Sequence, residues 1–393
     1  MSDPIVIVAA ARTPMGGLGG ALATATAAEL GGAAIAAALA RAGLDPERVD
    51  ELIMGCVLQA GQGQAPARQA GFKAGLPEHV PASTVNKMCG SGMKAVMLAH
   101  DSLRGGGASL VVAGGMESMS NAPYLLPRMR AGARLGHAVA QDHMFLDGLE
   151  DAYEPGRLMG DLAEDCAAAF QFTRAAQDAY ALTSLDRARE AQASGAFAAE
   201  IAPVAIASRW GAAEVAEDER PRTARPERIP TLTPAFRRDG TITAANAAGI
   251  SDGAAALALM RESEARRRGV PIRARILGQA THAQAPADFP TAPAPAVEKL
   301  LARLAWTISD VDLWEVNEAF ALVPMAFMAR TGADPARINI HGGACALGHP
   351  IGASGARVLV TLLHALERRN LATGVATLCI GGGEATAMAI ERA

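Results

Sequence analysis

The sequence is short of charge, of aromatic rings and of long apolar runs. Of its 393 residues only 19% are charged and 4% are aromatic, and the formal net charge is −4. This weak negative balance gives no electrostatic reason to expect nucleic acid as a partner. No uncharged apolar stretch reaches the roughly 18 residues of a membrane span, and residues 1–8 lack the basic region of a signal peptide. We therefore expect no membrane segment and a first strand near the N-terminus.

Cysteine is also scarce, and its spacing is irregular. The five cysteines are odd in number and form no CxxC pair, so the pattern indicates neither a disulfide framework nor a zinc site. They are Cys56, Cys89, Cys166, Cys345 and Cys379. Free thiols fit a reducing compartment, so the cytoplasm is the expected location and no metal site is expected.

The chain carries an internal repeat. Half of its residues are apolar, and a chain of this length is expected to form two or three domains. Short pieces of the first third recur in the same order near the C-terminus, the first at an offset of 301 − 39 = 262. The pairs are Leu39–Arg41 with Leu301–Arg303, Val49–Asp50 with Val311–Asp312, Ser91–Lys94 with Ser354–Arg357, and Gly114–Glu117 with Gly381–Glu384. The conserved order predicts a duplicated fold.

Helical and strand patterns alternate within each repeat. Helices are expected at Gly31–Arg41, Met93–Arg104 and Ala356–Arg369, and strands at Glu51–Met54, Leu110–Ala113, Ala376–Ile380 and Ala385–Ile390. Short apolar strands between helices favour an α/β fold with buried sheets. We divide the chain into an N-terminal α/β half (residues 1–119 plus about 246–270), a loop domain (120–245) and a C-terminal α/β half (271–393).

The loop domain has no counterpart in the repeat. One helix is clear within it: Thr173 is a good N-cap, and the helical pattern runs to about Ser194, just before Gly195. The segment Glu214–Arg228 is crowded with charge and proline. We expect that segment to be a solvated loop.

Cys89 is a candidate nucleophile. It lies among glycines directly before an expected helix, where free N–H groups and the helix dipole favour a thiolate. The same pattern also suits a small buried residue at a strand–helix junction. From this segment alone both interpretations stay open.

His349 is a candidate acid–base group. It lies in the glycine-rich run Gly342–Gly352, which Pro350 stiffens just after the histidine. A histidine held in a loop before a helix suits proton transfer, and we rank it above His341. Because most isolated histidines are structural or exposed, that alternative remains.

Two more polar groups follow expected strands. Cys379 precedes Gly381–Gly383, whose N–H groups could serve an oxyanion; it could equally be a buried strand cysteine. Asn317 is either a turn residue or a positioned polar group. If the two halves pack about a pseudo-twofold axis, the helices that follow Cys89 and His349 would begin at one site.

Together these motifs resemble the thiolase family over nearly the whole chain. The matching segments are Val85–Gly92, Gly114–Tyr124, Thr243–Ala256, Val316–Ala321, Gly342–Gly355 and Cys379–Gly383. The resemblance implies a duplicated αβαβα layered fold with a loop domain over the active site. It also implies a homodimer or homotetramer, with Ser118–Arg130 helping in assembly.

The resemblance implies a reaction and its residues. His349 helps form the Cys89 thiolate, which takes the acyl group from a coenzyme A thioester. Cys379 then removes a proton from the α-carbon of acetyl-CoA, and the carbanion attacks the acyl-cysteine. The family pattern stabilises one oxyanion with the N–H groups of Cys89 and Gly381, and the enolate oxygen with His349 and a water held by Asn317. It implies coenzyme A thioesters as substrates and no tightly bound cofactor.

Contacts to coenzyme A carry over from the same resemblance. They are Met159, Arg222, Phe236, Ala244, Ala247, Ala248, Ile250, Ala319 and Phe320. Arg222 matches the partner of the adenine end, although a solvated charge is the alternative. Leu158 stands where the family often has histidine, and Ala248 where a serine usually bonds pantetheine. The segment Ala287–Pro293 departs from the short-chain pattern.

Several functions compete at this point. The leading one is an acetyl-CoA acetyltransferase that forms or cleaves acetoacetyl-CoA, which Met159 favours; the second is a broader 3-oxoacyl-CoA thiolase of fatty-acid degradation. A decarboxylating condensing enzyme of the ketoacyl synthase type shares the fold, but it pairs its cysteine with two histidines or with a histidine and an asparagine. The Cys379–Gly383 motif argues against it. A non-catalytic acyl-CoA binder would be expected to have lost a reactive cysteine, and both are present.

Overall fold

A ten-stranded mixed sheet runs through the computed structural model, which describes residues 3–208 and 211–393. Its main path has the order β12-β13-β14-β11-β1-β10-β5-β3-β4, and β2 pairs with β10 at the side. The strands are β1 (Ile5–Arg12), β2 (Gly16–Gly17), β3 (Glu51–Gly55), β4 (Ala82–Val85), β5 (Leu110–Ser118), β10 (Ser251–Arg261), β11 (Ala274–Ala283), β12 (Leu313–Val316), β13 (Thr373–Ile380) and β14 (Glu384–Arg392).

The strand order is the same in both halves. The first half reads β1-β10-β5-β3 and the second reads β11-β14-β13-β12. In each half the first two pairings are antiparallel and the third is parallel. The halves join where β1 meets β11, over only two residue pairs, Val6 with Arg275 and Ile7 with Ala274. The duplicated α/β fold expected from the sequence repeat is therefore confirmed.

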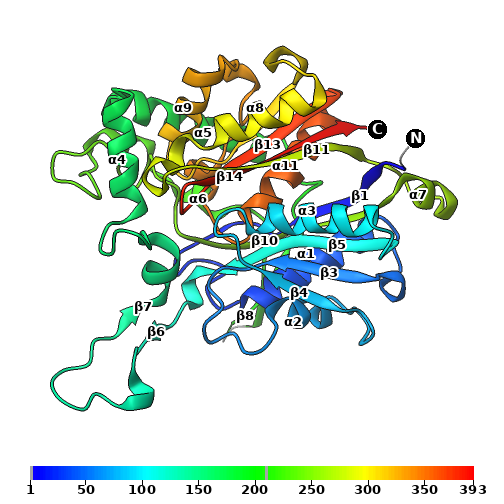
Figure 1. Ribbon diagram of the computed structural model, residues 1–393, viewed down its shortest axis with the longest axis horizontal. Coiled ribbons are helices and arrows are strands. Elements are labelled where there is room, and N and C mark those ends of the chain that lie inside the picture. Colours follow the sequence, from blue (N-terminus) through cyan, green and yellow to red (C-terminus); the bar gives the residue numbers. More distant parts are fainter. Residues whose placement is uncertain (1–2, 209–210) are drawn as a thin grey trace.

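Helices complete five layers. One outer layer holds α1 (Ala27–Arg41) and α2 (Pro66–Lys73), the central layer holds α3 (Ser91–Arg104) and α11 (Ser354–Arg369), and the other outer layer holds α8 (Pro293–Leu304) and α9 (Leu322–Thr331). Three apolar cores fill the spaces between the helical layers and the two sheet halves. In Figure 1 the blue and cyan first half lies below the orange and red second half.

The two central helices touch at their first turns. A Cβ atom added to Gly355 would lie 2.4 Å from the backbone nitrogen of Met93, and one added to Gly92 would lie 2.8 Å from that of Ala356. Only glycine permits backbones to approach so closely. Cys89 precedes α3 by two residues, and His349 precedes α11 by five, so this contact brings the two candidate residues towards one another from different halves.

The inserted segment separates β5 from β10, two strands whose counterparts β13 and β14 are joined by Gly381–Gly383 alone. It contains β6 (Tyr124–Leu125), β7 (Gln141–Asp142), a π-helical turn (Phe145–Leu149), α4 (Met159–Ala169), α5 (Arg174–Ala193), β8 (Val204–Ser208), β9 (Gly211–Val215) and α6 (Glu219–Thr223). The β6–β7 hairpin extends away from the body of the molecule (Figure 1).

The Thr173 cap is confirmed, because its hydroxyl accepts from the N–H of Ala176 at 3.1 Å. Two short helices elsewhere, α7 (Glu262–Arg268) and α10 (Ala344–Leu347), complete the fold.

The prediction that Glu214–Arg228 is a solvated loop is wrong. It contains part of β9 and all of α6, and Asp218 at its centre is fully buried. The Asp218 carboxylate accepts from both Nη atoms of Arg12, at 2.7 and 2.9 Å, and Arg12 Nε donates to Glu200 at 2.6 Å. Burial lowers the pKa of Arg12, but the two carboxylates raise it by more, so the guanidinium stays charged. This ion cluster fixes the charged segment to β1.

Replacing Arg12 with methionine should lower the free energy of unfolding by about 3–5 kcal/mol, because two carboxylates would remain buried without a cation. Urea unfolding followed by circular dichroism measures the change. The matched control is Arg275→Met, which removes a part-exposed pair with Glu262 and should cost under about 1 kcal/mol. Equal losses in the two variants would contradict the role given to the buried cluster.

The described part of the chain, residues 3–208 and 211–393, contains no helix that is both long and apolar enough to cross a bilayer.

Candidate active site

A cavity of about 760 Å³ opens between the two halves and the inserted segment, and its walls are mainly apolar. Cys89, His349 and Cys379 all line it, together with Gly381. These residues come from the start of α3, the loop before α11 and the end of β13. The structure therefore gathers on one wall the three groups that the sequence singled out separately.

Cys89 lies in a tight turn between β4 and α3. Met88 has φ 47°, and the Ser91 hydroxyl fixes the turn by donating to Met88 O at 2.6 Å and accepting from Lys87 N at 2.8 Å. Burial raises the pKa of the Cys89 thiol to about 11, although the N–H groups of Gly381 and Cys89 act to lower it. The pKa lowering expected from the helix N-terminus is thus outweighed by burial, so a base is needed to form the thiolate.

Cys379 lines the same cavity as Cys89 and lies near the end of β13, a strand that is buried except at its first residue. Burial raises the pKa of its thiol well above the usual value, and the neighbouring Cys89 raises it further. The backbone N–H of Gly381, two residues on, acts to lower the pKa of the Cys89 thiol. The Cys89 thiol therefore has a backbone donor, the N–H of Gly381, whereas the Cys379 thiol is available as an acid or base.

His349 is held on both sides. Its backbone N–H donates to Gly249 O at 2.9 Å, and its ring Nδ1 lies 2.6 Å from the hydroxyl oxygen of Ser354. Burial, and then the charge of Arg357, lower the pKa of His349 to about 3, so the ring is neutral at neutral pH. Nε2 is buried and has no hydrogen-bond partner within residues 3–208 and 211–393. It is the ring nitrogen left to face a substrate or the thiol.

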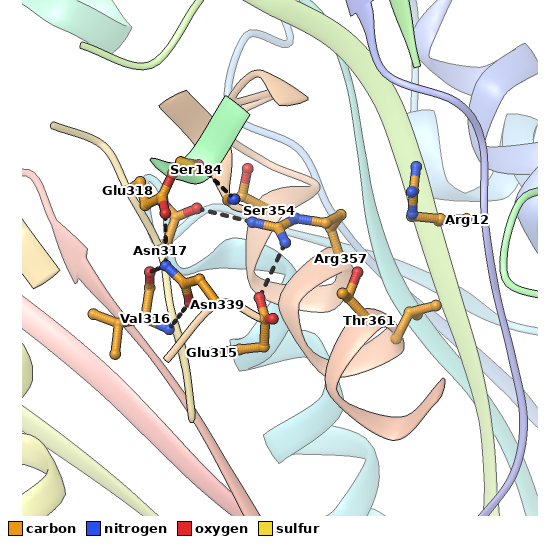
Figure 2. Close-up of polar contacts among 12 residues, drawn as sticks. Arg12, Ser184, Glu315, Val316, Asn317, Glu318, Asn339, Ser354, Arg357 and Thr361 are labelled. Atoms are coloured by element: carbon orange, nitrogen blue, oxygen red, sulfur yellow. Dashed lines mark hydrogen bonds and ion pairs between the residues drawn. The ribbon is translucent and has the colours of Figure 1, made fainter. Parts of the chain in front are cut away.

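Asn317 lies behind His349 and not on the cavity wall. Its Nδ2 is 3.5 Å from His349 Nδ1, and its Oδ1 accepts from Arg357 Nη2 at 3.4 Å. Arg357 also pairs with Glu315 at 3.2 Å. Figure 2 shows Arg357 reaching from α11 to Glu315 in β12 and to Asn317, which directly follows that strand. Burial raises the pKa of Glu315 to about 8.

Two buried carboxylates that the sequence analysis missed hold the surrounding loops. Glu117 accepts from the N–H groups of Val57, Leu58 and Gly352, at 3.0, 3.1 and 2.9 Å. Gly352 belongs to the His349 loop, so Glu117 ties that loop to the first half. A charged residue inside the apolar run of β5 was the available signal, because such a residue is rarely buried without partners.

Glu318 anchors the other end of the His349 loop. Its carboxylate accepts from Ser184 Oγ at 2.7 Å, Asn339 Nδ2 at 2.8 Å and Cys345 N at 3.0 Å. These contacts join α5 of the inserted segment to the second half (Figure 2). No sequence signal indicated them, because the partners lie 21 to 134 residues away.

The positions assigned to coenzyme A fall on the cavity wall, with one exception. Those that line it are Met159, Phe236, Ala244, Ala247, Ala248, Ile250, Ala319 and Phe320. Arg222 does not; Arg220 does, and its buried Nε has no hydrogen-bond partner in the described part of the chain. Arg220 also lines an adjoining hollow of about 340 Å³ with Arg225 and Arg228. Arg222, the residue assigned to the adenine end, thus lies two positions from the arginine that lines both spaces.

Family models match almost the entire chain. The thiolase N-terminal domain matches residues 5–263, and the thiolase C-terminal domain matches residues 270–392. The chain belongs to the thiolase family. The family expected from the motifs is confirmed, and with it the duplicated layered fold.

Relatives of this thiolase are similar over their full length. It is 48% identical to the acetyl-CoA acetyltransferase of Allochromatium vinosum, with 100% of each chain covered. It is also 48% identical to the cytosolic acetyl-CoA acetyltransferase of Mus musculus, covering 100% of this chain and 99% of that one.

Solved thiolase structures superpose closely. The Bacillus anthracis acetyl-CoA acetyltransferase gives a TM-score of 0.97 at 40% identity, covering 100% of this chain and 99% of that chain. The Acat5 thiolase of Ascaris suum, solved in complex with coenzyme A, gives 0.93 at 40% identity, covering 99% of this chain and 100% of that one. Among residues 3–208 and 211–393 of the present thiolase, no cluster of three or more His, Cys, Asp or Glu could hold a metal ion.

Proposed function

We propose that this thiolase is an acetyl-CoA acetyltransferase, which transfers an acetyl group between two acetyl-CoA molecules to give acetoacetyl-CoA and coenzyme A, and runs in reverse. One observation carries the proposal: two thiols and a neutral imidazole from three separate segments line one cavity beside the N–H of Gly381. The full-length similarity to acetyl-CoA acetyltransferases supports the substrate.

In the first half-reaction His349 Nε2 takes the proton of the Cys89 thiol. The thiolate attacks the thioester carbonyl, and the N–H groups of Cys89 and Gly381 bind the oxyanion; one such donor is worth roughly 100–1,000-fold in rate. The carbon–sulfur bond to coenzyme A then breaks. The leaving thiolate takes the proton of the adjacent Cys379 and departs as coenzyme A. Acetyl-Cys89 remains, with an imidazolium at His349 and a thiolate at Cys379.

In the second half-reaction the Cys379 thiolate removes a proton from the methyl group of a second acetyl-CoA. The developing enolate oxygen is stabilised by the imidazolium Nε2–H of His349, and Asn317 supports that ring from behind. The carbanion attacks acetyl-Cys89, and acetoacetyl-CoA forms as the Cys89 thiolate leaves. His349 returns its proton to Cys89, which restores the starting charges.

The cavity suits a thioester with a long apolar arm and anionic groups at its far end. Met159, Phe236 and Phe320 offer apolar wall to the pantetheine chain. Arg220, Arg225 and Arg228 gather positive charge in the adjoining hollow, where phosphates are attracted. We assign coenzyme A to these surfaces, with Arg220 in place of Arg222 as the nearest cation.

Packed aromatic rings favour short acyl chains. Phe289 is buried, lines the cavity and packs edge-on against Phe320 with ring centroids 6.4 Å apart. A longer chain would have to displace these rings, which costs packing energy. We expect kcat/KM for thiolysis of acetoacetyl-CoA to exceed that for 3-oxooctanoyl-CoA by about tenfold or more. A preference for the longer substrate would instead favour the second candidate, a broad 3-oxoacyl-CoA thiolase of fatty-acid degradation.

Three further points belong to the same proposal. Residues 120–245 act as a loop domain that helps bind coenzyme A, between α/β halves made of 1–119 with about 246–270 and of 271–393. The enzyme works as a homodimer or homotetramer in the cytoplasm; the mouse relative is named as cytosolic. Catalysis uses no tightly bound cofactor, with coenzyme A thioesters as its only small-molecule partners.

A further inference from the structure

Ser354 touches the catalytic histidine from the side opposite the cavity. It is the first residue of α11 and is fully buried. Its oxygen lies 2.6 Å from His349 Nδ1 and 2.9 Å from the carbonyl oxygen of Pro350. Figure 2 shows Ser354 on the same helix as Arg357.

The two short contacts of Ser354 fix where its single hydroxyl proton lies. A carbonyl oxygen can only accept, so the hydroxyl donates to Pro350 O. The Ser354 oxygen must then accept from His349, which places a proton on Nδ1. The opposite arrangement, with the hydroxyl donating to Nδ1, would leave two oxygens 2.9 Å apart without a proton between them.

Without the contact from Ser354, Asn317 would favour the Nε2–H tautomer of His349. Arg357 donates to Asn317 Oδ1, which turns the amide nitrogen towards His349 Nδ1 at 3.5 Å. That nitrogen is a donor, and it would bond to an unprotonated Nδ1. At 3.5 Å it competes weakly with the 2.6 Å contact to Ser354. Ser354 and Asn317 favour different tautomers of His349, and Ser354, which makes the shorter contact, sets the tautomer.

We propose that Ser354 is a positioning residue that holds His349 as the Nδ1–H tautomer, so that Nε2 offers its lone pair to the Cys89 thiol. The S–H bond of Cys89 breaks and the Nε2–H bond forms, giving a thiolate and an imidazolium whose Nδ1–H still donates to Ser354. Ser354 thus has the orienting role that a carboxylate has in the hydrolase triad. The inference rests on the proposed function, because it concerns the same acylation step.

The structural cost of losing the hydroxyl should be small. Pro350 O also accepts from the N–H groups of Ala353 and Ser354, both at 3.0 Å, so it keeps partners in a Ser354→Ala variant. Thr361→Val is the matched control, because it removes another buried hydroxyl of α11, one that contacts Glu200 and not the histidine. Ser354→Thr keeps the hydroxyl and should restore function.

The test follows acylation of Cys89 by acetyl-CoA in single-turnover mass spectrometry, and alkylation of Cys89 by iodoacetamide against pH. In Ser354→Ala we expect acylation about 10- to 100-fold slower, with alkylation displaced to higher pH, while Ser354→Thr and Thr361→Val stay near the parent protein.

Nitrogen-15 NMR of labelled histidine, assigned with a His349→Asn variant, should show the Nδ1–H tautomer in the parent and a shift in Ser354→Ala. An Nε2–H tautomer in the parent, or an unchanged alkylation profile in Ser354→Ala, overturns the inference. Absence of acylation in the parent protein would overturn the proposed function instead.

Discussion

Cys89→Ala should be unable to form an acyl-enzyme. Removing a nucleophile typically lowers turnover by about 10⁴-fold or more, because the remaining donors can bind the thioester but cannot displace coenzyme A. Intact mass spectrometry after incubation with acetyl-CoA should show one added acetyl group in the parent protein, located at Cys89 by peptide mapping. The alanine variant should show none.

Cys166→Ala is the control for that experiment. Cys166 is also buried and contributes to the same apolar core as Cys379, but it is not on the cavity wall. Its variant should be acetylated like the parent protein. An acetyl group mapped to another residue in the parent, or full acetylation of Cys89→Ala, would contradict the role of Cys89.

Cys379→Ala should separate the two half-reactions. Its acetylation by excess acetyl-CoA should remain, because attack by Cys89 needs His349 and the N–H groups rather than Cys379; release of coenzyme A then relies on a proton from solvent. Formation of acetoacetyl-CoA should fall by about 10³-fold or more, because no group remains to remove the α-proton.

Hydrogen exchange gives Cys379 a direct readout. In deuterated water the parent protein should exchange the methyl protons of acetyl-CoA, and Cys379→Ala should not. Exchange of labelled coenzyme A into acetyl-CoA reports the acylation step alone and serves as the internal control. Methyl exchange that persists in the variant would assign the base to a different group.

Local signals made the repeat and the helices around the candidate residues predictable. The helix predicted at Met93–Arg104 begins two residues earlier, at Ser91, and the one predicted at Gly31 begins at Ala27. The second difference has a local cause, since Thr26 and Glu29 form a capping box that the apolar pattern alone does not reveal. Element types were thus readable from the sequence, and their ends depended on single side chains.

Charged residues were harder to place. Asp218 is 206 positions from Arg12, and nothing near it in sequence shows that its charge is buried. The same holds for Glu318, whose partners are backbone and side-chain donors brought in by folding. A charge pattern indicates exposure on average, but a buried carboxylate is defined by donors that only the tertiary structure supplies.

The close approach of Gly92 to Ala356, and of Gly355 to Met93, has a consequence for how the sequence can change. The reacting sulfur belongs to one half of the chain and the reacting nitrogen to the other, and the two are kept in register where the helix backbones abut. Substitutions in the outer helical layers would leave this contact unchanged. A methyl group added at Gly92 or Gly355 would push the two helices apart and lengthen the distance between the Cys89 sulfur and the His349 ring. The packing between the first turns of α3 and α11 is thus the contact between the two halves that tolerates the least change, and a substitution on one side would require a compensating one on the other.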